Sequence, residues 1–80
     1  MNFKPVNGAA YQIKGTITAL GTKASNINCI FAGREDKKFK FITLRSRINE
    51  NEETEFSPVS FWLTPSEIDE VSIDQLVMAR

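Results

Sequence analysis

The chain has no histidine and a single cysteine among its 80 residues. Without histidine it lacks the most common general base and the most common metal ligand of proteins. One cysteine can form neither an internal disulfide nor the thiolate cluster of a zinc site. Because Cys29 lies between Ile27 and the pair Ile30 and Phe31, we predict a small buried side chain there rather than a nucleophile.

Long apolar runs and nucleotide-binding motifs are also missing. No stretch approaches the ~20 apolar residues that cross a bilayer, and the first residues, MNFKPVNGAAYQIKG, have no hydrophobic signal core. Neither a P-loop nor the glycine patterns of dinucleotide-binding and hydrolase sites occur. We therefore expect a cytoplasmic protein that uses no cofactor or metal and does not enter the membrane.

The charges sum to zero but are unevenly placed. Six basic residues lie between Arg34 and Arg47, whereas eight acidic residues and no basic one lie between Glu50 and Asp74. Catalytic carboxylates need a rigid cleft, and these occupy a predicted loop and a predicted helix start, so we expect a solvated acidic face and no enzyme. The asymmetry suits a binding face of one sign, or a homodimer in which unlike patches meet.

The alternation of apolar and polar residues predicts four strands. It runs through YQIKGTITAL, where Gly15 allows a bend or bulge, while INCIFAG is apolar on both faces and indicates a central strand. GREDKK supplies a turn that makes residues 27–48 a hairpin, and NENEETE supplies the next loop. Pro58 suits the start or the edge of a strand. The expected strands are residues 11–20, 27–33, 39–48 and 59–63.

The clearest local signal follows the fourth strand. In TPSE, Thr64 is placed as an N-cap, Pro65 takes the first helical position and Glu67 completes a capping box. A short helix is expected over residues 65–70. Beyond it, VSIDQLVMAR allows two interpretations. We favour a turn at residues 72–74 and a fifth strand over residues 75–80, because of the alternating and β-branched content, and an extension of the helix is the alternative.

These elements predict a mainly β fold, a small five-stranded barrel-like sheet with one short helix near residues 65–70. Short strands at close spacing are typical of such barrels, and the pattern is similar to that of OB-like and SH3-like barrels. Residues 1–10 lack periodicity and are expected to be an N-terminal tail, with residues 11–80 as a single domain. A chain of this size buries only about 60% of its unfolded surface, so dimerisation would stabilise it.

The third strand carries the main functional signal. Along KFKFITLRSRI the apolar residues change face between Phe41 and Ile42. If Ile42 and Leu44 point into the core, the other face turns its phenylalanines and arginines outward, beside an outward tryptophan on the fourth strand. Rings bordered by basic residues bind single-stranded nucleic acid through stacking and phosphate contacts. The predicted nucleic-acid-binding residues are Lys14, Lys38, Phe39, Phe41, Arg45, Arg47 and Trp62.

Two alternatives stay open for the same residues. Phe39 and Phe41 could be core residues if a bulge moves the neighbouring aliphatic residues across, and the arginines could pair with the acidic loop at residues 50–55. Aromatic and arginine side chains are also enriched in protein interfaces. The second functional hypothesis is therefore a protein–protein interaction module. Such a module could be a phage or mobile-element protein that acts as an adaptor or as an inhibitor of a host protein.

Overall fold

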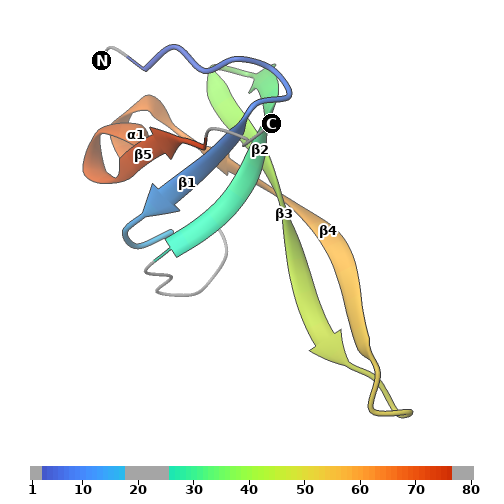
Figure 1. The fold of residues 1–80 in the computed structure, drawn as a ribbon. Coiled ribbons are helices and arrows are strands. Elements are labelled where there is room, and N and C mark those ends of the chain that lie inside the picture. The colour runs from blue at the N-terminus through green and yellow to red at the C-terminus, as the bar shows by residue number, and fades with distance from the viewer. Residues whose placement is uncertain (1–2, 18–25, 77–80) are drawn as a thin grey trace.

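The strands form one antiparallel sheet in the order β4-β3-β2-β1-β5 (Figure 1). The computed structural model describes residues 3–17 and 26–76. The second strand in sequence lies at the centre of the sheet, as INCIFAG predicted. The elements are β1 (Ala10–Lys14), β2 (Asn26–Glu35), β3 (Lys38–Ile48), β4 (Thr54–Leu63), α1 (Pro65–Glu70) and β5 (Ser72–Gln75).

The prediction of a mainly β fold with five strands and one short helix is confirmed, but the sheet is open. Within the described residues β4 and β5 are its two edges, and no pairing joins them. The open side of the core is covered instead by α1, whose Ile68 is buried, and by the N-terminal segment, whose Phe3 packs on the core. The helix contacts both edge strands, β4 and β5, whereas Phe3 packs against rings of β1 and β3.

The two faces of the sheet have different surroundings. Along β1, along β3 up to Phe41 and at the end of β4, odd-numbered side chains point into the core and even-numbered ones point outward. Each large side chain removed from water in this way stabilises the fold by about 1.5–3 kcal/mol. The buried core consists of Tyr11, Ile13, Ile17, Cys29, Phe31, Phe39, Phe41, Phe61, Leu63 and Ile68.

The segment predicted as a tail, residues 1–10, packs on this core from Phe3 onward. The Phe3 ring lies 5.9 Å from the ring of Tyr11 and 5.5 Å from that of Phe39, measured between centroids. The backbone N–H of Val6 donates to the Tyr11 hydroxyl at 2.8 Å, and the N–H of Gly8 donates to the Phe31 carbonyl at 2.9 Å. An isolated phenylalanine gives no periodicity, which is why the pattern did not reveal this contact.

The ladder between β2 and β3 has one register shift, and the extra residue that causes it lies in β2. Phe31 pairs with Phe41, but the next recorded pair is Arg34 with Phe39, so β2 has one extra residue between them. This β-bulge includes Gly33, whose φ of 103° suits glycine. The turn is shorter than predicted, because Asp36 and Lys37 alone connect the strands, both with positive φ.

The start of α1 and the bend after β1 both follow from local chemistry. The capping box is confirmed, since the N–H of Glu67 donates to Thr64 Oγ1 at 3.2 Å and the N–H of Thr64 donates to Glu67 Oε1 at 3.0 Å. Gly15 bends the chain after β1, as predicted, with a φ of 136°.

In the described part of the chain no helix combines the length and apolarity needed to cross a bilayer.

The last strand begins earlier than predicted. Residues 72–74, expected to be a turn, belong to β5, where Ile73 pairs with Ile13 of β1. The helix ends at Glu70 and Val71 is already extended, so the predicted alternative of a longer helix is wrong. Val71 and Ile73 are β-branched, and both side chains pack against the core from alternate positions of the chain, which favours a strand. Of the strand predicted at 75–80, residues 77–80 lie outside the described residues.

The β3–β4 hairpin extends well beyond the rest of the sheet (Figure 1). Its ladder is unbroken from the pair Phe39–Leu63 to the pair Ile48–Thr54, whereas β2 pairs with β3 only as far as Ile42. We call the two-stranded part, residues 43–59, the arm. The fourth strand is therefore longer than the predicted 59–63, and Pro58 lies inside it, which an edge strand tolerates because it needs no N–H on its free side.

Candidate functional site

The expectation that Phe39 and Phe41 face outward beside Trp62 is wrong. The two phenylalanines are 1% and 0% exposed, and the Phe41 ring stacks on Phe61 with 5.5 Å between centroids. The third strand is regular and the bulge lies in β2, so nothing carries Ile42 inward. The change of apolar face along β3 has another cause: the strand leaves the core after Phe41, and beyond that point neither face is buried.

The predicted residues Arg45 and Arg47 lie on the continuation of the core-facing side of β3, where no core residue of the described part of the chain lies beneath the arm. Both are exposed. Arg47 Nε donates to Glu55 Oε2 at 3.2 Å, which is the ion pair with the acidic loop that the sequence allowed. The side-chain amide of Asn49 donates to the same carboxylate at 2.9 Å, and these two contacts, Asn49 first, lower the pKa of Glu55.

Lys14, Lys38 and Trp62 lie on the outer face but do not form one track. Lys14 pairs with Asn26 at one end of β2, and Lys38 pairs with Glu35 at the other end. Nine residue steps along β2 separate these positions, or roughly 30 Å. Trp62 lies beside Glu35, to which its Nε1–H donates at 3.0 Å. The seven predicted residues therefore occupy the core, one side of the arm and two distant parts of the outer face.

A set of apolar side chains that the sequence interpretation missed gathers on the outer face. Four of them are well exposed: Ile30 at 48%, Leu44 at 66%, Phe56 at 66% and Ile48 at 74%. Trp62, at 38%, completes the large exposed members on this face. We call the set the outer apolar strip, and its members are Ile30, Ile42, Leu44, Ile48, Phe56, Pro58 and Trp62.

The strand register makes the strip continuous. Ile30 pairs with Ile42, Leu44 pairs with Pro58, and Phe56 pairs with Ser46, the position next to both Leu44 and Ile48 on that face. Direct and diagonal neighbours on one face of a sheet lie within about 4.5–8 Å, close enough for large side chains to touch. The strip therefore runs from the sheet out along the arm without a break.

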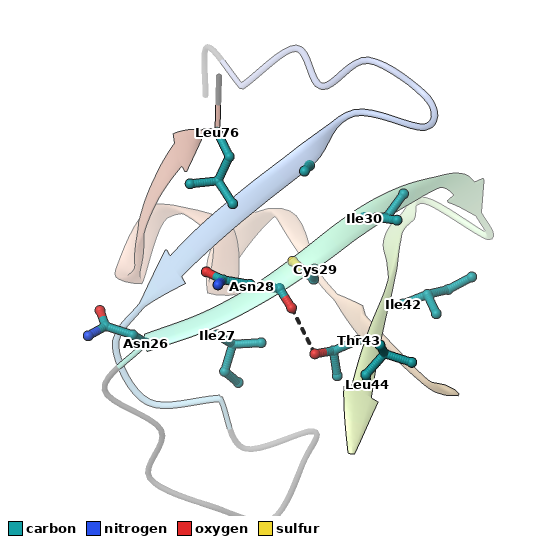
Figure 2. Close-up of a pocket in the computed structure, with 10 residues that line it drawn as sticks. Asn26, Ile27, Asn28, Cys29, Ile30, Ile42, Thr43, Leu44 and Leu76 are labelled. Atoms are coloured by element: carbon teal, nitrogen blue, oxygen red, sulfur yellow. Dashed lines mark hydrogen bonds between the residues drawn. The ribbon is translucent and has the colours of Figure 1, made fainter. Parts of the chain in front are cut away.

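A shallow groove opens where β3 separates from β2. It has a volume of about 480 Å³, and its lining includes the apolar residues Ile30, Ile42, Leu44 and Leu76 together with the polar residues Asn26, Asn28 and Thr43. Figure 2 shows Ile30 of β2 beside Ile42 and Leu44 of β3, and the hydrogen bond from Thr43 Oγ1 to the Asn28 carbonyl, 2.8 Å long, that spans the two strands. The groove therefore forms the base of the strip.

The chemistry available elsewhere in the described residues is limited. Cys29 is buried, and desolvation raises the pKa of its thiol to about 12. Its Sγ lies 3.6 Å from the Tyr11 carbonyl, inside the core. Among the residues that the structure describes, no group of three or more histidine, cysteine, aspartate or glutamate side chains is placed to hold a metal ion.

The sequence did contain a signal for the strip. In FSPVSFWL, Phe56, Pro58 and Trp62 share one alternate face, but a strand beginning at Val59 excludes the first two. Extending that strand to Thr54 places Phe56 beside the aliphatic residues of β3. No protein family, curated protein or solved structure matches this chain in comparisons of its sequence and fold.

Proposed function

We propose that this protein is a non-catalytic protein-interaction module that binds through the outer apolar strip. The observation that carries the proposal is the continuous row of apolar side chains, most of them exposed, from Ile30 to Ile48 on one face of the sheet and arm. Scattered exposed apolar residues are normal, whereas a contiguous patch of several hundred Å² is typical of an interaction surface. We place this binding in the cytoplasm, the location predicted from the sequence.

The form of the arm supports the same function. A two-stranded hairpin is only marginally stable by itself in water, and among the described residues this one has neither a third strand nor a core behind it. A partner that covers the strip would bury apolar surface at about 25 cal/mol per Å² before the costs of association are subtracted. Phe56 and Trp62 belong to the aromatic residues that dominate binding energy in protein interfaces.

Single-stranded nucleic acid binding stays a prediction with fewer groups to carry it. Of the three rings predicted to bind, Phe39 and Phe41 lie in the core, and Trp62 alone is left to stack on a base, beside Lys40, whose Nζ lies 5.7 Å from the ring centroid. One stacked base contributes about 1–3 kcal/mol. The arginines of β3 lie on the opposite side of the hairpin from Trp62, so they cannot border the same base.

Two measurements separate these functions. The immobilised chain is exposed to a nuclease-treated lysate and compared with the double variant Leu44→Ser/Phe56→Ser and with a control from the other side of the arm, Arg45→Ala/Ser57→Ala. Protein binding that survives the control and is lost in the strip variant supports the proposal. Binding that the strip variant keeps contradicts it, and salt-sensitive quenching of Trp62 by single-stranded DNA or RNA would favour nucleic acid instead.

A further inference from the structure

We infer that the partner of the outer apolar strip is a second copy of this chain, in a two-fold dimer whose arms lie face to face. The inference rests on the proposed function, because it names the occupant of the same surface. Area, charge and shape each support it. A second copy is also a partner that is present wherever the protein itself is present.

The area of the strip is close to what a stable dimer needs. Its five large members are 38–74% exposed. With about 150–250 Å² for each large side chain, these fractions leave roughly 600 Å² of accessible surface on the strip. A standard specific interface buries about 800 Å² on each partner, so the strip alone would supply about three quarters of that area.

The charge pattern permits the strip to meet itself. In a two-fold interface the same patch contributes to both sides, so a charged residue near the axis would face its own copy. On the outer face of the arm, from Ile42 to Ile48 and from Thr54 to Ser60, every residue is uncharged. The charged residues on the strands of the arm, Arg45, Arg47 and Glu55, lie on its other side, and Glu50, Glu52 and Glu53 lie in the loop at its tip. The net charge of zero also leaves no long-range repulsion between copies.

The strip carries both halves of a complementary fit. Its base is the groove of about 480 Å³ beside Leu44, and its far end carries the projecting side chains of Phe56 and Ile48. These lie two and four residues beyond Leu44 along the hairpin, or about 7–13 Å. When two antiparallel arms cross near Leu44 and Pro58, the far end of each reaches the groove of the other. A single chain therefore provides the projection and the recess.

Sedimentation equilibrium of the full chain tests this dimer. We expect the wild type to approach twice the 9.0 kDa of one chain as its concentration rises. Phe56→Ser should weaken the dimer at least about 30-fold, the effect of an interface hot spot. Ser57→Ala changes the adjacent residue on the other side of the arm and should leave the dimer intact. Circular dichroism checks that both variants keep the strands.

The outcomes separate this inference from the proposed function. A wild-type chain that stays at 9.0 kDa at every concentration overturns the dimer, and so does a dimer that Phe56→Ser leaves unchanged. If the chain is monomeric but still captures another protein in a strip-dependent way, the proposed function stands and the second copy is rejected. If the chain is monomeric and capture does not depend on the strip, both are rejected.

Discussion

Phe41 and Phe61 stack across β3 and β4 with their ring centroids 5.5 Å apart and their planes 18° apart. One residue further along the same ladder, Ile42 and Ser60 form the next pair and face the other side of the sheet. The hydrophobic core and the outer apolar strip are therefore adjacent along β3. Substitutions only a few residues apart should affect either folding or association.

Phe41→Ala should lower the free energy of unfolding by about 3–5 kcal/mol, because it leaves a cavity under the stacked ring of Phe61. Leu44→Ala, three residues further along β3, removes a side chain that is 66% exposed and should change it by less than about 1 kcal/mol. Urea unfolding of dilute protein, followed by circular dichroism, measures both. Equal losses in the two variants would contradict the assignment of faces.

The two-residue turn between β2 and β3 offers a stabilising substitution. Asp36 and Lys37 have φ values of 49° and 65°, which match a type I′ turn and favour glycine at the second position. Lys37→Gly should raise the free energy of unfolding by about 0.5–1 kcal/mol, since it relieves a left-handed conformation. Lys38→Gly, at the first residue of β3, should lower it by up to about 0.5–1 kcal/mol. The same direction of change in both variants would contradict the turn geometry.

Cys29 should be unreactive in the folded protein. Burial raises the pKa of its thiol from 9.0 to about 12, so at pH 8 the reactive thiolate is scarce and enclosed. A thiol reagent should label it slowly in buffer and quickly in urea. In a Cys29→Ala background, Ser57→Cys places a thiol on the exposed arm and should react quickly in both conditions. Rapid labelling of native Cys29 would contradict its place in the core.

The same shift has a defined effect on stability against pH. Below pH 9 the thiol is protonated in both the folded and unfolded chains, so the contribution of the buried thiol to the free energy of unfolding is fully present. Between pH 9 and 12 the unfolded chain loses this proton first, and that contribution to stability falls. Comparison of Cys29→Ala with the wild type across this window isolates the effect from the lysines and tyrosine. If the stability of the wild type rose relative to that of Cys29→Ala between pH 9 and 12, the prediction would be contradicted.

The sequence predicted those elements that short-range chemistry determines. Thr64, Pro65 and Glu67 are close neighbours, so the helix start could be predicted without knowledge of the rest of the fold. The central position of β2 followed from apolar residues on both its faces. The bend at Gly15 followed from a residue that tolerates a positive φ. Each of these features needs only a few consecutive residues.

The missed features depend on contacts between distant segments. Alternation shows that Phe39 and Phe41 share a face with Arg45, but which face is buried depends on where β2 stops pairing with β3. Pro58 suggested a strand boundary because a proline is tolerated inside a strand only at an edge, and edge position is a property of the whole sheet. The place of Phe3 in the core likewise depends on rings far along the chain.

The central claim, that the outer apolar strip is the surface by which this protein binds protein, is tested most directly by photo-crosslinking from the arm. A photoreactive phenylalanine analogue replaces Phe56 on the strip or, as the control, Ser57 on the other side of the same strand. With the purified chain and with nuclease-treated lysate, we expect a crosslinked protein product from position 56 and little from position 57. Equal products from both positions, or a product from position 57 alone, would contradict the claim.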